Sequence, residues 1–269
     1  MTGMAKTPDI GLDDVRVNYN AIGIDLIEAM YSDDYLSMGG IASTDILARK
    51  SGIGKDSRIL DVGSGLGGPA LHLAAVYGCR VTGLDVIELN ILEAEKRAKT
   101  RQLDHLVDFT LGDATDMPFS NGTYDVILGQ DAWCHIGEKN KLIEECARTL
   151  APNGTIAFTD WLQTGQMDDQ FQREILSAFA SPGLATLESY HTLLTNHGFS
   201  NIEQEDIGED FVNEYRRTVT RLKNMEEQVT RKYSSRVFQI VLEKNSLILR
   251  ALEEDKMGGG RFVGNKQSV

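Results

Sequence analysis

The sequence is poor in cysteine and contains no long apolar run. Three cysteines in 269 residues are an odd number, which argues against a disulfide framework and favours a reducing compartment. No uninterrupted apolar run approaches the ~18 residues of a membrane span, and residues 1–10 lack the apolar segment of a secretory leader. We therefore expect a cytoplasmic protein that has no membrane partner.

Basic residues are also scarce relative to acidic ones. The chain has 27 Lys and Arg against 40 Asp and Glu, a formal net charge of −13. This balance repels the phosphates of nucleic acids and the surfaces of anionic lipids. We expect a small-molecule partner, for which a cationic group suits the charge, and no nucleic acid. The chain is expected to act as a monomer or homodimer and to hold no metal.

Apolar strands alternate with amphipathic helices between residues 51 and 162. The first unit is a strand at 58–62, a glycine turn, and a helix that ends at Gly78. Four further strands and two helices are predicted in the same alternation, at 79–86, 88–101, 107–113, 123–133, 139–150 and 155–162. Strands and helices at this spacing form βαβ units, which predict an α/β fold with a parallel sheet covered by helices on both faces.

The segments outside these units have a different pattern. Residues 1–50 are predicted to form a helical cap over the sheet edge. A polar stretch, a helix at 187–198 and a strand at 200–207 follow the fifth strand. Residues 209–256 contain no Gly or Pro and carry apolar residues at helical intervals, which predicts a helical lid. The remaining residues, 51–208 and 257–269, are expected to form the core domain.

The glycine loop GSGLGG at 63–68 fits two ligand-binding patterns. It matches the dinucleotide pattern G-x-G-x-x-G and equally a G-x-G-x-G pattern. Asp85, at the end of the second strand, suits a ribose diol in either case. Asp61 separates the two, because a carboxylate at the mouth of the loop repels a pyrophosphate and attracts a cation. S-adenosylmethionine carries a sulfonium and an ammonium and no phosphate, so it is the favoured ligand.

Five ordered motifs resemble those of the class I S-adenosylmethionine-dependent methyltransferases. They are LDVGSGLGG, GLDV, GDATDMPF, YDVILGQDAWCHI and LAPNGTIAFTDW, between residues 60 and 161. The resemblance implies a Rossmann-like, mostly parallel sheet of seven strands, with residues 258–266 as a reversed last strand. It also implies S-adenosylmethionine as cofactor and S-adenosylhomocysteine as product.

The same resemblance implies a set of cofactor-binding residues. Asp85 binds the ribose hydroxyls, and Asp113 with the backbone of Ala114 reads the adenine edge. Gln130 and Asp131 lie beside the methionine portion. The full set is Asp61, Gly63, Gly65, Gly67, Asp85, Val86, Asp113, Ala114, Gln130 and Asp131.

Two stretches, YLSMGG at 35–40 and QDAWCHI at 130–136, resemble two families within the class, the phosphoethanolamine and the sarcosine/dimethylglycine methyltransferases. Both families methylate small amines. In the phosphoethanolamine enzymes an N-terminal tyrosine and a histidine form a catalytic pair, and the resemblance places this pair at Tyr19 and His135.

The acceptor implied by the resemblance is an amine that carries a carboxylate. The tyrosines and the arginine that hold phosphate in the phosphoethanolamine enzymes align here with Glu174, Ala178 and Ala180. That departure disfavours a phosphorylated substrate. Two further stretches are more similar to the dimethylglycine enzymes, SPGLATLESYHTLLTNHGF at 181–199 and FVNEYRRTV at 211–219.

Methyl transfer requires little covalent machinery, because it is an in-line displacement that depends on alignment and on exclusion of water. An amine acceptor must lose a proton first. His135, at the end of the fourth strand, is the candidate base or proton relay. The alternative interpretation of His135 is a structural histidine beside a site that relies on proximity alone.

Aromatic and basic side chains supply the candidate acceptor site. Aromatic faces attract methylated ammonium groups, although the same residues also suit ordinary core packing. For an acceptor carboxylate, Arg173, Arg216 and Arg217 are all available, and the sequence does not choose among them. The predicted substrate-binding set is Tyr31, Tyr35, Trp133, Trp161 and Arg173.

Three alternative functions remain open from the sequence. One is phosphoethanolamine methylation, and a second is transfer of the methyl group to oxygen or carbon of a natural product. The third belongs to another class, a nicotinamide-dependent oxidoreductase or a non-catalytic nucleotide-binding module, because the glycine loop alone fits a dinucleotide.

Overall fold

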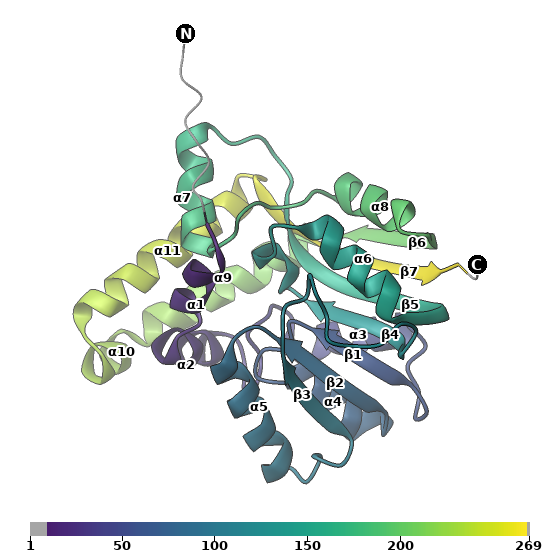
Figure 1. Cartoon of the computed structure of the whole chain (residues 1–269). Helices are drawn as coiled ribbons and strands as arrows, with labels where there is room; N and C mark the ends of the chain where they lie inside the picture. The colour runs from purple at the N-terminus through teal and green to yellow at the C-terminus, as the bar shows by residue number, and fades with distance from the viewer. Residues whose placement is uncertain (1–9, 268–269) are drawn as a thin grey trace.

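The computed structural model describes residues 10–267, which form one seven-stranded sheet with helices on both of its faces (Figure 1). Residues 1–9, where the expected cap begins and where the sequence lacks an apolar leader, lie outside the described residues, as do residues 268–269. The strands are β1 (Arg58–Val62), β2 (Arg80–Asp85), β3 (Val107–Leu111), β4 (Tyr124–Gln130), β5 (Leu150–Gln163), β6 (Phe199–Asp206) and β7 (Met257–Lys266).

The strand order is that of a Rossmann-like sheet with one reversed strand. The order across the sheet is β3-β2-β1-β4-β5-β7-β6. Strands β1 to β5 pair in parallel, whereas β7 lies antiparallel between β5 and β6. The predicted α/β fold, with residues 258–266 as the reversed strand, is therefore confirmed. In such a sheet, ligands bind outside the carboxyl ends of the parallel strands, where the strand order reverses.

Eleven α-helices surround the sheet within residues 10–267. They are α1 (Leu12–Asn18), α2 (Ala21–Met30), α3 (Gly40–Lys50), α4 (Gly68–Tyr77), α5 (Glu88–Thr100), α6 (Lys139–Thr149), α7 (Asp169–Phe179), α8 (Leu187–Asn196), α9 (Gly208–Asn224), α10 (Glu226–Lys232) and α11 (Ser235–Glu253). Among the described residues, no helix is both long and apolar enough to cross a membrane.

Several predicted bounds are wrong: β5 begins at Leu150 and not at 155, and two further differences have a local cause. The strand predicted at 123–133 ends at Gln130, because Asp131 has a left-handed φ of 56°. A short 3-10 turn, η1 (Trp133–His135), follows it. The polar stretch predicted after the fifth strand contains α7, which begins where the Asp168 side chain accepts hydrogen bonds from the N–H groups of Gln170 and Phe171.

The sheet is covered by one apolar core on each face. On one face, α6 and α8 contribute side chains such as Leu142 and Tyr190, which pack near Phe158 of β5. On the other face, α3 and α4 contribute side chains such as Leu47 and Leu71. The two cores hold the parallel strands in register, so the loops at their carboxyl ends start from fixed points.

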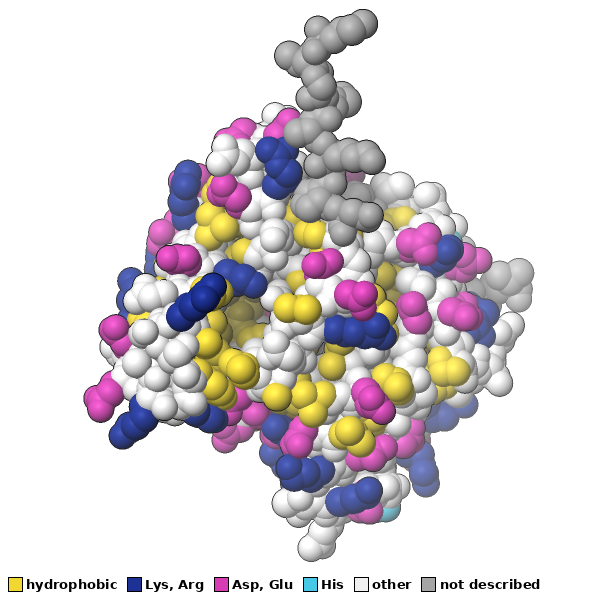
Figure 2. Space-filling view, turned by 60° about the vertical axis from the view of Figure 1, so that its left-hand side comes forward, with side chains coloured by type: hydrophobic (Ala, Val, Ile, Leu, Met, Phe, Trp, Pro, Cys, Tyr) yellow, Lys and Arg dark blue, Asp and Glu magenta, His cyan; other side chains and the backbone are white. Residues whose placement is uncertain are grey.

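The N-terminal helix α2 packs on α9, α10 and α11, and α1 contacts α2 (Figure 1). Polar contacts fasten them: Asp25 accepts hydrogen bonds from Lys232 and Tyr233, each at 2.7 Å, and Asn18 accepts one from Lys244 at 3.1 Å. On the face seen in Figure 2, charged side chains of both signs are interspersed around centrally placed apolar ones. Leu12, Val17 and Ile22 of α1 and α2 stay exposed. The polar contacts thus add to the apolar packing of Leu26 and Met30 of α2, which are buried against α9, α10 and α11.

Candidate active site

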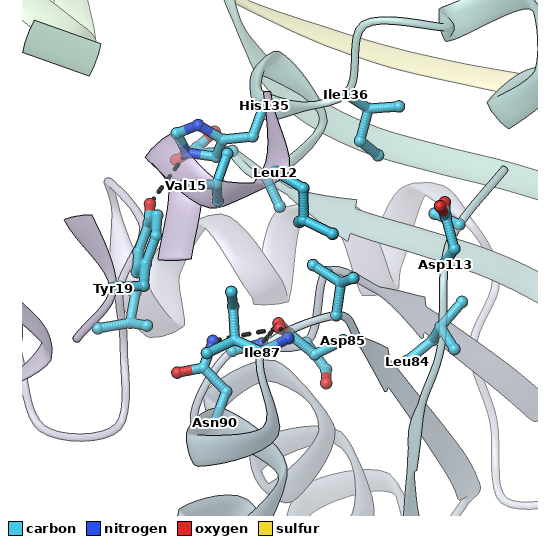
Figure 3. A pocket seen from close by; sticks show the side chains of 18 of the residues that line it. Leu12, Val15, Tyr19, Leu84, Asp85, Ile87, Asn90, Asp113, His135 and Ile136 are labelled. Carbon is cyan, nitrogen blue, oxygen red and sulfur yellow. Dashed lines mark hydrogen bonds between the residues drawn. The ribbon is translucent and has the colours of Figure 1, made fainter. Parts of the chain in front are cut away.

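A pocket of about 310 Å³ lies at the carboxyl ends of β1, β2 and β4, beneath α1 (Figure 3). Ten residues singled out from the sequence line it together, although they come from distant parts of the chain. They are Tyr19, Gly63, Gly65, Asp85, Val86, Asp113, Ala114, Gln130, Asp131 and His135.

The glycine loop bends tightly at the floor of this pocket. Gly63, Gly65 and Gly67 all have left-handed φ angles, of 81°, 52° and 83°. At Gly63 a Cβ atom would lie 2.4 Å from the Cβ of Ala132, so a side chain does not fit there. The loop therefore presents bare backbone to a ligand, and the N-terminus of α4 begins directly behind it.

Asp85 is held rigidly at the end of β2. Its Oδ2 accepts a hydrogen bond from the Gly65 N–H at 2.8 Å, and its Oδ1 accepts from the Ile87 N–H at 2.8 Å and from Asn90 Nδ2 at 3.2 Å (Figure 3). Burial raises the pKa of Asp85, and these donors act against that rise. The carboxylate is thus aimed at the pocket and linked to the glycine loop.

Asp61 lies behind the loop with both carboxylate oxygens buried and without a hydrogen-bond donor among the described residues. Burial raises its pKa to about 7, and the nearby charge of Asp85 adds to the rise. A buried carboxylate that lacks a partner is costly. A positively charged ligand in the loop compensates that cost, whereas a pyrophosphate increases it.

Gln130 and Asp131 link the end of β4 to the segment before α3. Asp131 accepts a hydrogen bond from Thr159 Oγ1 at 2.6 Å and from the Met38 N–H at 2.8 Å. Burial raises the pKa of Asp131 to about 7. Gln130 accepts from Thr44 Oγ1 at 2.8 Å and donates to Ser37 Oγ at 3.0 Å. The pocket therefore holds a second buried carboxyl group beside the glycine loop.

Tyr19 and His135 meet at one end of the pocket (Figure 3). The Tyr19 hydroxyl lies 3.0 Å from His135 Nε2, and His135 Nδ1 lies 3.1 Å from the Ala180 carbonyl oxygen. A carbonyl only accepts, so Nδ1 carries the hydrogen and Nε2 of the neutral ring accepts one from Tyr19. Burial lowers the pKa of His135 to about 4, which keeps the ring neutral at pH 7.

Trp133 and Tyr35, both expected in the acceptor site, pack elsewhere. Trp133 is fully buried, its Nε1 donates to the Val62 carbonyl at 3.0 Å, and its ring stacks on Phe158 at 4.1 Å between centroids. Tyr35 packs over Gly68 and its hydroxyl bonds Thr44 Oγ1 at 3.1 Å. The 3-10 turn directs Trp133 into the sheet core.

The remaining members of the expected acceptor site do not line the pocket either. Trp161 packs edge-on against Phe179, Phe211 and Tyr215, in a buried cluster that Tyr31 adjoins. Arg173 lies on α7, which packs against α11. Arg216 and Arg217 pair at the surface with Glu253 at 2.7 Å and Glu214 at 2.9 Å. Phe179 contacts both Trp161 and His135, so its ring lies between them.

Sequence reasoning missed several residues that shape the pocket. Asn90 is buried, lines the pocket and orients Asp85. Its signal was a polar residue on the buried face of the helix predicted at 88–101. Ser37, Met38 and Thr159 bind the side chains of Gln130 and Asp131 from other elements. They lie in the stretches YLSMGG and LAPNGTIAFTDW, but the motifs alone assigned them no role.

A cluster of four charged side chains ties the segment before α3 to α5. Arg97 donates to both Glu28 and Asp34, at 2.5 Å and 2.8 Å, and Arg101 also pairs with Asp34. Asp34 also lines the pocket, with a left-handed φ of 72°. This cluster therefore holds one wall of the pocket in place.

Replacing Arg97 with alanine is expected to lower the free energy of unfolding by about 1–3 kcal/mol. Glu28 loses its ion-pair partner and keeps only the Asp34 N–H, and the Asp34 carboxylate keeps only Arg101, although these two carboxylate side chains are just 22% and 11% exposed. Urea denaturation measures the change. The matched control is Lys99→Ala, an exposed residue on the same helix, which should stay within about 0.5 kcal/mol of the wild type. Equal effects of the two substitutions would contradict a structural role for the cluster.

Comparison with known proteins identifies relatives for most of the chain. A family model described as a methyltransferase domain matches residues 60–158. A sarcosine/dimethylglycine N-methyltransferase from Halorhodospira halochloris is 30% identical over 196 residues, which cover 70% of each chain. A glycine/sarcosine/dimethylglycine N-methyltransferase from Actinopolyspora halophila is 33% identical over 188 residues, 68% of this chain and 32% of that relative.

Among solved structures, a Haemonchus contortus phosphoethanolamine N-methyltransferase 2, in complex with phosphomonomethylethanolamine and S-adenosylhomocysteine, has a TM-score of 0.88. It is 23% identical to this chain, and the match covers 95% of this chain and 60% of that one. The chain thus spans 32% of the Actinopolyspora relative and 60% of the Haemonchus protein.

Proposed function

Because the chain belongs to the S-adenosylmethionine-dependent methyltransferases, we propose that it transfers a methyl group to the nitrogen of a small amine. Sarcosine and dimethylglycine are the leading acceptors, since the relatives from Halorhodospira and Actinopolyspora are named for them. The observation that carries the proposal is the half-buried, neutral His135 beside Tyr19, at the end of a pocket lined with carboxylates. An amine acceptor needs a proton acceptor of this kind.

The pocket fits S-adenosylmethionine, which supplies a methyl group on a positively charged sulfur when it is bound. The glycine loop has no side chains at Gly63 and Gly65, so a ligand can approach its backbone closely. Asp85 suits a ribose diol. The unpartnered carboxylate of Asp61 suits a cation. These residues, together with Asp113, Ala114, Gln130 and Asp131, would hold the cofactor.

His135 and Tyr19 move the proton that the acceptor loses. The lone pair of Nε2 accepts the hydrogen of the Tyr19 hydroxyl, so the proton travels through Tyr19: the hydroxyl oxygen takes the proton of the acceptor while its own hydrogen passes to Nε2. A pKa near 4 means that the ring holds a proton only briefly. The pair therefore acts as a relay that passes the proton on to water, while the surrounding side chains exclude bulk water from the acceptor.

The N-terminal and C-terminal helices act as a cap and a lid in this proposal. Residues 1–50 supply Tyr19 and the wall at Asp34, and residues 209–256 hold α1 and α2 from the other side. Residues 51–208 and 257–269 form the cofactor-binding core. Lys244 of the lid bonds Asn18, next to Tyr19, and we propose it as the basic group that meets an acceptor carboxylate.

The Asp85→Ala substitution is expected to weaken binding of S-adenosylhomocysteine by about 1.5–3 kcal/mol. The loss has two sources, the charge-assisted bonds to a ribose and the anchor that Asp85 provides for Gly65. Isothermal titration calorimetry measures the affinity. Asp104→Ala, an exposed acid in the loop before β3, is the matched control for the change in charge. Equal affinities of the two variants for S-adenosylhomocysteine would contradict a role of Asp85 in cofactor binding.

Affinity for S-adenosylmethionine is expected to rise as pH increases from about 6 to 8. In the free protein, burial raises the pKa of Asp61 and of Asp131 to about 7, so both are partly protonated at neutral pH. A bound cation favours the charged carboxylates, lowers their pKa and releases protons. Calorimetry in buffers of different ionisation enthalpy counts those protons.

The Asp61→Asn variant is the control for this pH dependence, because it keeps the shape of the side chain and the titration of the ligand itself. We expect it to bind more weakly at pH 8 and to release fewer protons. A wild-type affinity that does not change across this range would contradict a cation-binding role for the buried carboxylates.

The acceptor is tested by measuring S-adenosylhomocysteine formation with glycine, sarcosine, dimethylglycine, ethanolamine and phosphoethanolamine. We expect the highest kcat/KM with sarcosine or dimethylglycine. A preference for phosphoethanolamine would contradict this choice of acceptor and would indicate the activity for which the Haemonchus protein is named. No turnover with any of these amines would refute N-methylation of a small amine.

A further inference from the structure

The backbone that carries His135 is clamped from outside the pocket. Cys134, the residue before it, donates its N–H to Asp160 Oδ1 at 2.9 Å and accepts at its carbonyl from Ser181 Oγ at 2.7 Å. Asp160 and Ser181 are both fully buried, and they come from β5 and from the loop after α7. The backbone N–H and the backbone carbonyl of Cys134 are therefore both fixed by side chains that do not line the pocket.

A second layer holds these two side chains. The Tyr190 hydroxyl of α8 donates to Asp160 Oδ2 at 2.6 Å, and the Gly183 N–H donates to Ser181 Oγ at 3.2 Å. Tyr190 is fully buried as well. Each polar atom in this chain of contacts has a partner, and such satisfied buried networks favour a single local geometry.

The same loop also binds the histidine ring. Ala180 precedes Ser181, and its carbonyl accepts from His135 Nδ1 at 3.1 Å. Ala180 has a left-handed φ of 50°, a conformation that non-glycine residues rarely adopt. Two hydrogen bonds thus join residues 134–135 to residues 180–181. The Ser181 hydroxyl donates to the Cys134 carbonyl, and the His135 ring donates to the Ala180 carbonyl. Because the bonded residues are adjacent in sequence on both sides, a shift in one hydrogen bond displaces the other.

We propose that Asp160, Ser181 and Tyr190 are positioning residues that select the Nδ1–H tautomer of His135. This tautomer leaves the Nε2 lone pair directed at Tyr19, as the proposed proton relay requires. In the other tautomer Nε2 carries the hydrogen, and two lone pairs, on Nδ1 and on the Ala180 oxygen, face each other. The inference rests on the proposed function, because the choice of tautomer affects catalysis only if His135 and Tyr19 relay the proton.

Nitrogen-15 NMR of the ligand-free protein with labelled histidine tests the assignment, because the two ring nitrogens have different chemical shifts when protonated and when not. The five histidines are few enough for His135 to be assigned by the signals that are lost in His135→Gln. We expect the wild type to show a single Nδ1–H tautomer. Ser181→Ala and Tyr190→Phe should show a mixture and lower kcat by roughly fivefold, with the KM for S-adenosylmethionine unchanged.

Two further variants separate positioning from general loss of packing. Asp160→Asn keeps an acceptor for the Cys134 N–H and a polar partner for Tyr190, so it should retain the wild-type tautomer. Thr149→Val removes another fully buried hydroxyl, which bonds the Glu145 carbonyl on α6, and should leave the His135 signals unchanged. Tyr190→Phe removes one oxygen atom only, so it decides the question if Ser181→Ala does not fold.

The inference is overturned if wild-type His135 carries its hydrogen on Nε2, or if both Ser181→Ala and Tyr190→Phe keep the single Nδ1–H tautomer and the wild-type kcat. A failure of the proposed function is a separate result. If the protein methylates no amine, the relay is lost, but the tautomer comparison was made without ligand and still decides what the network does to His135.

Discussion

The His135→Ala variant is expected to turn over about 100-fold more slowly than the wild type, with unchanged affinity for S-adenosylhomocysteine. The half-buried ring is the proposed proton acceptor that Tyr19 faces, and alanine has no atom that takes its place. Affinity for the cofactor is preserved because the glycine loop and Asp85 are held by other contacts. Initial rates at saturating amine and calorimetry with S-adenosylhomocysteine measure the two quantities.

Two companion variants make the result specific to His135. His105→Ala removes an exposed histidine before β3 and should leave the rate unchanged. Tyr19→Phe removes only the hydroxyl and should have a smaller effect than His135→Ala, because Nε2 stays available. If His135→Ala kept the wild-type rate, the site would work by proximity alone and the histidine would be structural.

Trp133→Ala is expected to destabilise the protein by about 3–5 kcal/mol. The indole is fully buried, stacks on Phe158 and donates to the Val62 carbonyl at 3.0 Å. Alanine would leave a cavity in the core and an unpartnered carbonyl at the end of β1. Urea denaturation gives the free energy of unfolding, and Leu92→Ala, at a position 56% exposed on α5, is the control for loss of an apolar side chain.

The outcome also separates the two interpretations of Trp133. A residue of the acceptor site would alter the KM for the amine and leave stability nearly intact. A core residue lowers stability, and Trp133→Phe, which keeps a ring against Phe158, should recover part of it. A stable Trp133→Ala protein with a raised KM would contradict the packing described here.

The glycine loop and the strand ends beside it could be predicted because their geometry is local. Gly63, Gly65 and Gly67 adopt φ angles that glycine tolerates best, and Asp85 follows its strand directly. The strand, turn and helix around them are specified by residues close in sequence. Five ordered motifs therefore identified the fold, including the reversed strand β7.

The packing around the end of β4 could not be predicted, because it depends on contacts between distant residues. Asp131 adopts a left-handed conformation whose carboxylate is held by Met38 and Thr159. That bend ends β4 three residues early and directs Trp133 into the core. The bond between Tyr19 and His135 joins residues 116 positions apart, and only the resemblance to known enzymes suggested it.

One measurement tests the central claim most directly, that the carboxylate-lined loop receives a sulfonium cofactor and not a dinucleotide. Thermal unfolding is followed with saturating S-adenosylmethionine and, separately, with saturating NAD. We predict stabilisation by S-adenosylmethionine alone, of about 2.7 kcal/mol at 100 times the dissociation constant, and its reduction in Asp61→Asn. Stabilisation by NAD alone would contradict the account.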